Sequence, residues 1–405
     1  MTVPVSPLTD PAVLADPHPT LAALRESGPV HRLDMRLGLP VWVVTRYADV
    51  LAAMSDPRLS NDPRHATGLD EMLRDDFLSR SMIGADPPAH TRLRRLVSKA
   101  FTARRVEGLR PRVQEITDTL LDRITPHGAA DLVGEFALPL PVTVIGELLG
   151  VPEADRDRFR TWTDEMLDRP FDGHSDLALV DAARARMHGY LTDLVAAKRT
   201  RPADDLITDL IAATDEGERL DEQELLAMVF LLLIAGYVTT VSLIGNGTLA
   251  LLSSPDQLDR LRADPSLVPG AVEELLRFDG PVNPGLTRVA LEDLEIGGVQ
   301  IPRGAMVLLA IAAADRDPER FPEPDRLDIG APDPGHLAFG HGIHYCLGAP
   351  LARLEGQVAF TALLARLPDL ALAVDEDKLR WTGGGVLRGP RALPVTFTPT
   401  PARVG

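Results

Sequence analysis

Cysteine is the scarcest residue type in this 405-residue chain, which contains a single one, Cys346. One cysteine cannot form an intrachain disulfide, and a zinc or iron–sulfur site built on cysteines would lack its other ligands. A lone cysteine also suits a reducing compartment. Aromatic residues are scarce as well, at 4%. We therefore expect a cytoplasmic protein whose core is mainly aliphatic.

Positive charge is in deficit too. Lys and Arg number 42 against 59 Asp and Glu, for a formal net charge of −17, which argues against general nucleic-acid binding. Residues 92–112 reverse this balance, because eight basic residues there accompany one acid, Glu107. Two interpretations stay open: a solvated helix face, or arginines that point inward to anionic groups beside others that form a docking patch for an acidic partner.

Long uncharged segments are rare as well: a single one, residues 225–252, is long enough to span a membrane. Its interior carries Thr, Ser and Asn side chains, and its acidic flank lacks the basic counterpart expected at a membrane border. The start of the chain shows no basic region followed by an apolar run, so no signal peptide is apparent. We expect no membrane partner and a buried helix, opened by a capping box of Asp221 and Glu224.

Local patterns predict a chain that is mainly helical. Runs bounded by Gly and Pro predict β-rich portions at roughly 29–46, 286–313 and 370–400. No repeat or clear linker is found, so one domain over residues 1–405 is expected, with a candidate mobile lid at 170–175. Helices are predicted over residues 19–27, 47–55, 87–99, 106–124, 140–149, 153–167, 177–198, 203–213, 221–254, 268–278 and 349–366.

The single cysteine lies in the stretch Phe339-Gly-His-Gly-Ile-His-Tyr-Cys-Leu-Gly348, directly before the helix predicted from Ala349. Pro350 suits the first turn of that helix. A thiolate at a helix N-terminus faces unpaired backbone N–H groups and the positive end of the helix dipole. The spacing Phe-x-x-Gly-x-His-x-Cys-x-Gly resembles the cysteine loop of the cytochrome P450 heme-thiolate monooxygenases.

Two further motifs precede this loop in the order that the family shows. They are Glu274-Leu-Leu-Arg277 and Pro318-Glu-Arg-Phe321-Pro-Glu-Pro-Asp-Arg326, so the resemblance covers nearly the whole chain. It implies a mainly α cytochrome P450 fold with a smaller β-rich subdomain. It also implies that Glu274, Arg277 and Arg326 form a buried network behind the cysteine loop. Paired buried charges can hold such a loop in one geometry, at a desolvation cost.

The resemblance implies heme b as the cofactor, with Cys346 as the axial ligand of its iron. Phe339 would pack near the sulfur, and the backbone at Gly348 would moderate its charge. No Cys-x-x-Cys-His is present, so the heme is expected to bind non-covalently. Its two propionates need cationic or hydrogen-bonding partners. By the family pattern these are His90, Arg94, Arg288 and His344.

The uncharged helix should lie across the heme from the cysteine. By resemblance, Gly236 leaves space for dioxygen, and Thr239 hydrogen-bonds it and a water molecule. Most members carry an acid just before this threonine, to relay protons, but this chain has Val238. Three hypotheses stay open: protons arrive through Thr239 and ordered water alone, a polar group of the substrate completes the relay, or peroxide supplies oxygen that is already reduced.

The expected substrate follows from positions that match the family's pocket. These positions are mainly aliphatic, without a charged anchor, which suggests a sizeable, mostly apolar natural product such as a polyketide-like metabolite. They are Ile83, Leu232, Ala235, Val282, Asn283, Val386 and Leu387.

The expected reaction is insertion of one oxygen atom, as hydroxylation or epoxidation. One alternative is oxidative ring closure or coupling at the same heme, or oxidation driven by peroxide. Another is a heme protein that binds gas or carries electrons without transforming a substrate. A structural protein with an inert cysteine would require all the ordered motifs to be coincidence.

Electrons should come from a separate protein, because the chain shows no flavin or nicotinamide fingerprint. We expect an NAD(P)H-linked redox partner of the small acidic ferredoxin type. The basic stretch and the helix after the cysteine would dock it. The expected docking residues are Arg104, Arg105, Arg112 and Arg353.

Overall fold

The computed structural model describes most of the chain, and the candidate lid at 170–175 lies outside the described residues. The described parts are Leu8, Asp10, Val13 and residues 15–34, 40–68, 77–167, 177–213, 217–331, 335–382 and 386–402. Each predicted helix has a counterpart among the helices found. The α-helices are α2 (His18–Ser27), α3 (Tyr47–Met54), α4 (Ala89–Ala100), α5 (Ala103–Gly108), α6 (Arg110–Ile124), α7 (Pro139–Leu149), α8 (Arg156–Leu167), α9 (Leu177–Thr200), α10 (Leu206–Ala212), α11 (Glu222–Leu252), α12 (Pro255–Ala263), α13 (Val268–Asp279), α14 (Ile311–Ala314) and α15 (Ala349–Arg366).

The strands form a smaller β-rich part, as predicted. Those that matter most belong to a five-stranded sheet of order β1-β2-β8-β5-β3, in which β2 runs parallel to β8 and the other pairs are antiparallel. This sheet joins two of the predicted β-rich portions. The strands are β1 (Val30–Asp34), β2 (Pro40–Val44), β3 (Leu59–Ser60), β4 (Ala129–Asp131), β5 (Leu286–Ala290), β6 (Leu294–Ile296), β7 (Val299–Ile301), β8 (Met306–Leu309), β9 (Ala371–Leu372) and β10 (Pro394–Thr396).

The third β-rich portion holds only the short strands β9 and β10, and they need a partner from elsewhere in the chain. β10 pairs with β9 on one side and with β4 on the other, with Pro394 opposite Asp131. β4 lies more than 200 residues before β10 in the sequence, and its three residues lack the alternation that marks a strand. This pairing is therefore a tertiary contact that local patterns do not predict.

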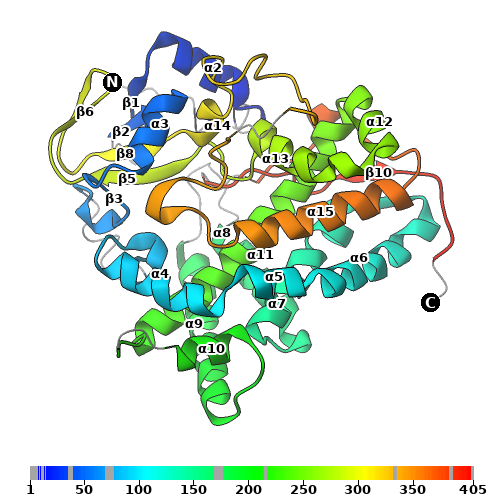
Figure 1. The fold of residues 1–405 in the computed structure, drawn as a ribbon, viewed down its shortest axis with the longest axis horizontal. Helices are drawn as coiled ribbons and strands as arrows, with labels where there is room; N and C mark the ends of the chain where they lie inside the picture. The colour runs from blue at the N-terminus through cyan, green and yellow to red at the C-terminus, as the bar shows by residue number, and fades with distance from the viewer. Residues whose placement is uncertain are drawn as a thin grey trace.

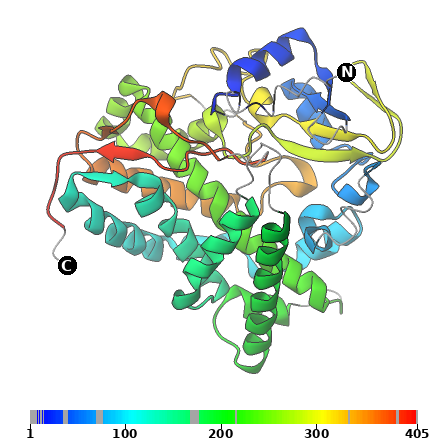
Figure 2. The same cartoon turned by 180° about the vertical axis from the view of Figure 1, so that it is seen from behind.

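Helix α11 forms the centre of the helical part. It begins with the predicted capping box, in which Glu224 N donates to Asp221 Oδ1 at 2.8 Å and Asp221 N donates to Glu224 Oε2 at 3.0 Å. The helix packs against α7, α9, α13 and α15, and Figure 2 shows it crossing the helical part from behind. Its length and hydropathy would suit a membrane span, but 67% of its most apolar window is buried inside the molecule. α11 is therefore a core helix.

The loop that leads into α15 lies where the helical part meets the five-stranded sheet. In Figure 1 this loop, in orange, passes beside α4 and below β5, and α15 continues from it across the front of α11. The fold thus brings α4, β5, α11 and the cysteine loop to one place.

Candidate active site

The cysteine loop is a tight turn that is closed by a hydrogen bond within its own backbone. Cys346 N donates to the carbonyl oxygen of Phe339 at 2.9 Å, which closes the loop. Gly340 and Gly342 have φ values of 72° and 70°, in the left-handed region that favours glycine. The glycines in this motif therefore have a local structural reason. They let the chain turn back so that Cys346 stands just before α15.

Cys346 is half-buried, and its surroundings act on its thiol in opposite directions. Burial raises the pKa of the thiol, whereas the backbone N–H groups of Gly348 and Ala349 and the charges of Arg94 and Arg353 lower it. The N–H groups belong to the start of α15, where the helix dipole is positive. The site is thus built to hold a sulfur anion once a further positive charge lies beside it.

Four residues from three separate elements meet near this thiol. His90 and Arg94 lie one turn apart on α4, Arg288 lies on β5, and His344 lies in the cysteine loop. The rings of His90 and His344 have centroids 4.2 Å apart. Burial is the main cause that lowers the pKa of His344 to about 3, with His90, Arg288 and Arg94 adding to it. Burial likewise lowers the pKa of Arg288 to about 10.

This cluster has more hydrogen-bonding capacity than the protein satisfies. His90 is 2% exposed, and neither of its ring nitrogens has a hydrogen-bond partner in the part of the chain that the structure describes. Within the described parts of the chain, no carboxylate forms an ion pair with Arg94 or Arg288. Buried polar atoms of this kind normally have partners. The cluster therefore fits a ligand with at least two anionic oxygens.

Ala235 and Thr239 lie on a partly exposed face of helix α11, which we call the notch. Ala235 is exposed and Thr239 half-buried, whereas most of the helix is buried. Spacing of four places both on one face, and Thr239 Oγ1 donates to the Ala235 carbonyl at 3.1 Å. Val238 packs against the main hydrophobic core. The position directly before Thr239 therefore carries an apolar side chain and no acid.

The comparisons with known proteins agree with this geometry. A family model described as Cytochrome P450 matches residues 166–392. The chain is 51% identical over 387 residues to the cytochrome P450 monooxygenase PikC of Streptomyces venezuelae, covering 95% of this chain and 91% of that protein. It is 51% identical over 392 residues to the vitamin D(3) 25-hydroxylase of Pseudonocardia autotrophica, covering 96% of this chain and 95% of that protein. The chain belongs to the cytochrome P450 family.

Solved structures confirm the predicted mainly α fold. The cytochrome P450 PksS of the bacillaene polyketide synthase of Bacillus subtilis superposes with a TM-score of 0.90 at 41% identity, covering 96% of this chain and 99% of that one. As a bacterial-type cytochrome P450, the chain is a monooxygenase with non-covalently bound heme b and a separate source of electrons. The non-catalytic and heme-free alternatives are therefore set aside.

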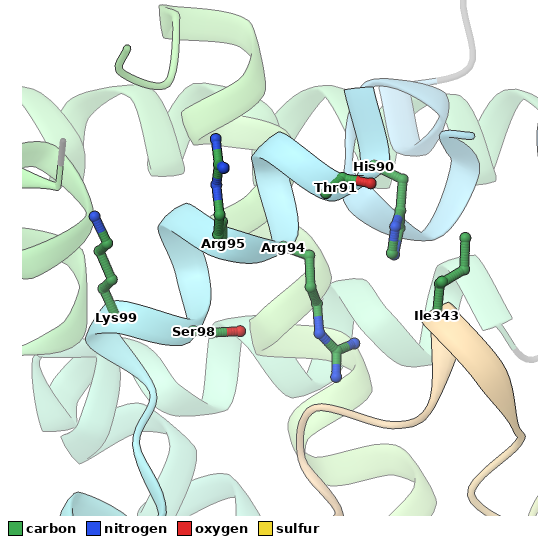
Figure 3. A pocket seen from close by; sticks show the side chains of 7 residues that line it. All are labelled: His90, Thr91, Arg94, Arg95, Ser98, Lys99 and Ile343. Atoms are coloured by element: carbon green, nitrogen blue, oxygen red, sulfur yellow. The ribbon is translucent and has the colours of Figure 1, made fainter. Parts of the chain in front are cut away.

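The residues present fit heme b. Iron would supply the positive charge that the Cys346 sulfur needs. The two propionates would supply the anionic oxygens that the unpartnered His90 nitrogens and the Arg94 and Arg288 guanidinium groups call for. Figure 3 shows His90 and Arg94 pointing to the side of α4 that faces Ile343 of the cysteine loop, whereas Arg95 and Lys99 point the other way.

One residue expected at the dioxygen site is directed at a neighbouring helix. A Cβ added to Gly236 would come within 2.7 Å of Ile145 Cγ1, on α7. Gly236 is therefore directed at α7, about 100° round the helix from Ala235, and not into the notch beside Thr239. Its lack of a side chain lets two helices pack closely. Gly236 therefore faces α7 in this structure, Ala235 is the residue that shares a face with Thr239, and the role of Gly236 in leaving space for dioxygen stays a prediction.

The buried network contains two of its three expected members. Arg277 forms a bidentate pair with Glu274, at 2.7 and 2.8 Å, and both side chains are 4% exposed. The side chain of Arg326 is 57% exposed and pairs with Glu323 at 3.3 Å, so it lies outside the network. Only its carbonyl oxygen takes part, accepting from Arg277 at 3.3 Å. Arg277 therefore binds the backbone carbonyl of Arg326, and the charged side chain of Arg326 takes no part in the network.

The expected substrate positions form two groups. In one, the turn at Val282 and Asn283 meets the segment before β10: Val282 bridges to Leu387, and Asn283 N donates to Val386 O at 3.0 Å. The Asn283 side chain is buried, and its amide nitrogen has no partner among the described residues. Val386 is 43% exposed.

The second group lies along α11. The Met82 amide, next to Ile83, contacts Met228 Sδ at 3.3 Å, and Met228 lies one turn before Leu232. Ile83 is 46% exposed, whereas Leu232 is 8% exposed and part of the core. Ala235 follows on the open face described above.

Sequence reasoning missed three acids around the site. Glu273 binds Arg353 at 2.7 Å, Asp315 accepts a hydrogen bond from Leu337 N at 2.7 Å, and Glu355 is fully buried on α15. Glu355 had a detectable signal, because it interrupts the apolar face that Leu351 and Val358 share with it. The other two act across contacts between distant segments, which leave no local pattern.

Proposed function

We propose that this P450 inserts one oxygen atom into a sizeable, mostly apolar natural product, such as a polyketide-like metabolite, by hydroxylation or epoxidation. The observation that carries this proposal is the Cys346 thiol beside an unneutralised cationic cluster, with the Ala235–Thr239 notch on the α11 face. The relatives support the reaction type: one is named a vitamin D(3) 25-hydroxylase, and the structural neighbour belongs to a polyketide synthase.

Heme bound at this site supplies the activation of dioxygen, and the chain supplies protons and position. Thr239 holds a hydroxyl at the notch, and Val238 offers no proton. We propose that ordered water at the Thr239 hydroxyl delivers the protons, helped by a polar group of the substrate. Peroxide as the oxygen source is the alternative that Val238 leaves open.

A second candidate function is oxidative ring closure or coupling. The missing acid at Val238 sets this chain apart from most members of the family and leaves this reaction open, although both reactions consume the same two protons for each dioxygen. This function would use the same heme and the same pocket positions. The products of the two reactions differ in whether they contain an oxygen atom from dioxygen.

The test uses the heme-loaded enzyme with a surrogate redox partner and isotopically labelled dioxygen. Substrates are first chosen by spectral shifts of the heme across a panel of macrolides and other apolar metabolites. If the enzyme inserts oxygen, the product should carry the label. In Val238→Glu, a larger share of the electrons consumed should then appear in product. Product without label would show ring closure or coupling, and unchanged coupling in Val238→Glu would contradict a proton supply limited at this position.

For the redox partner, we propose an NAD(P)H-linked ferredoxin that docks around the cysteine loop. Arg104 is exposed, whereas Arg105, Arg112 and Arg353 already pair with Asp209, Glu147 and Glu273. Ile343 and Tyr345 are 52% and 40% exposed in the loop itself. An apolar centre with cationic residues around it suits a small acidic partner. The same proposal places the enzyme in the cytoplasm.

A further inference from the structure

Asp315 occupies the point between the buried Glu274–Arg277 pair and the start of the cysteine loop. It follows α14 directly and is 1% exposed. Its backbone carbonyl and its side-chain carboxylate each accept a hydrogen bond from a different segment. The carbonyl oxygen accepts from Arg277 Nη1 at 2.9 Å, and the side-chain Oδ1 accepts from Leu337 N at 2.7 Å.

From Leu337 the hydrogen bonds continue to the cysteine itself. The Leu337 carbonyl accepts from Gly340 N at 2.7 Å, which closes a turn. The carbonyl of Phe339, inside that turn, accepts from Cys346 N at 2.9 Å. The peptide of Cys346 is thus joined to the buried ion pair by hydrogen bonds through Asp315, Leu337 and Phe339.

A second acid holds the same loop from its outer side. His336 Nδ1 accepts from Ala338 N at 3.1 Å, and its Nε2 lies 3.2 Å from Glu273 Oε2. Glu273 also binds Arg353, whose guanidinium donates to Tyr345 Oη at 3.1 Å and lies 4.5 Å from the Phe339 ring centroid. This outer brace is partly exposed. Asp315 is the inner brace and is 1% exposed.

We propose that Asp315 is a positioning residue for Cys346: its side chain transmits the fixed position of the Glu274–Arg277 pair to the loop that presents the thiolate. Removing the Asp315 acceptor leaves the Leu337 N–H unpaired in the interior, which costs about 1–3 kcal/mol unless the loop moves. Movement of the loop relieves that cost and displaces the sulfur. This inference rests on heme ligation by Cys346 and does not depend on the substrate proposed above.

The experiment compares three heme-loaded variants: Asp315→Ala, Asp315→Asn and Asp205→Ala. Asp205 is the control, because it is 3% exposed and its Oδ1 accepts one backbone N–H, that of Thr208 at 2.9 Å, at the start of α10, away from the cysteine loop; its Oδ2 also binds Lys198, so its loss of stability should be at least as large. The first readout is the fraction of thiolate-ligated heme in the carbon-monoxide difference spectrum. The second is the alkylation rate of Cys346, which reports on this residue alone because the chain has no other cysteine. Thermal unfolding is followed in parallel.

We expect both alanine variants to lose stability, and only Asp315→Ala to lose thiolate-ligated heme and to gain several-fold in alkylation rate. Asp315→Asn keeps an acceptor oxygen in place and should retain both signatures. Equal spectra and alkylation rates in Asp315→Ala and Asp205→Ala would overturn the proposal. If Asp315→Ala does not fold, Asp315→Asn is compared with Asp315→Glu, whose longer side chain must shift Leu337. If Asp315→Asn and Asp315→Glu then lose the same fraction of thiolate-ligated heme, the proposal is contradicted.

Discussion

Glu355 is an acidic residue that lies in the interior of the helical part. It is fully buried, and among the described residues only the Thr240 hydroxyl lies within reach of its carboxylate. Burial raises the pKa of Glu355 to about 8, and the Thr240 hydroxyl offsets this only in part. Glu355 is therefore protonated at neutral pH, in contact with the residue that follows Thr239. A neutral carboxyl at this position can store a proton near the notch.

This raised pKa makes stability depend on pH in a definite direction. The folded state holds the Glu355 proton up to about pH 8, whereas the unfolded chain releases it near its ordinary value of 4.5. Stabilisation by this group is complete below that ordinary value and is lost as the pH rises to about 8, at about 1.4 kcal/mol per pH unit.

The prediction is measured as the difference in unfolding free energy between the wild type and Glu355→Gln at several pH values. The difference cancels the contributions of other carboxyls and should fall steadily as the pH rises to about 8, then level off. Parallel stability curves for the two proteins would contradict a buried, protonated Glu355.

At the scale of elements, α7 and α11 approach each other closely at Gly236. A Cβ there would meet the Ile145 side chain at 2.7 and 2.8 Å, so one of the helices would have to shift. Overpacking of this kind costs typically about 1–3 kcal/mol. The close approach also limits how far the segment that carries Ala235 and Thr239 can move.

Gly236→Ala should therefore lower the free energy of unfolding by about 1–3 kcal/mol, and Gly236→Ala combined with Ile145→Ala should recover part of the loss. Denaturant unfolding of the two single variants and the double variant gives the coupling between these residues. The interpretation as dioxygen space predicts the opposite result, with unchanged stability and weaker binding of carbon monoxide to the reduced heme.

At the scale of the whole molecule, an acidic chain carries a local cluster of cationic groups around its cysteine. The net charge is −17, yet Arg94 on α4, Arg288 on β5 and Arg353 on α15 lie around the cysteine loop, and α5 adds Arg104 and Arg105. Several of these arginines already serve internal ion pairs, which weakens their attraction for a partner. Arg104 is exposed and therefore gives the cleanest test of docking.

Arg104→Glu should slow reduction by an acidic ferredoxin several-fold at low ionic strength and should reduce the salt dependence of the rate. Arg123→Glu is the matched control, because Arg123 is also exposed but lies at the far end of α6, away from the cysteine loop (Figure 1). Stopped-flow reduction under carbon monoxide measures both variants. Equal rates would locate the docking site elsewhere.

Features that depend on residues close together in the chain could be predicted from the sequence. The capping box of α11, the helix after Cys346 and the Glu274–Arg277 pair all depend on spacings of three or four residues, so local geometry dictates them. The turn glycines of the cysteine loop belong here too. Their spacing predicted the family, and with it the fold and the heme.

Only the tertiary structure decided which groups act across distant segments. Asp315 and Leu337 lie 22 residues apart, and β4 reaches β10 across most of the chain. The directions of Gly236 and the Arg326 side chain depend on which neighbour packs against each. The sequence by itself determined that Cys346 starts a helix and can present a thiolate. The packing of α13, the end of α14 and Leu337 decided what holds it, because buried contacts are set by segments that fold together and not by their order in the chain.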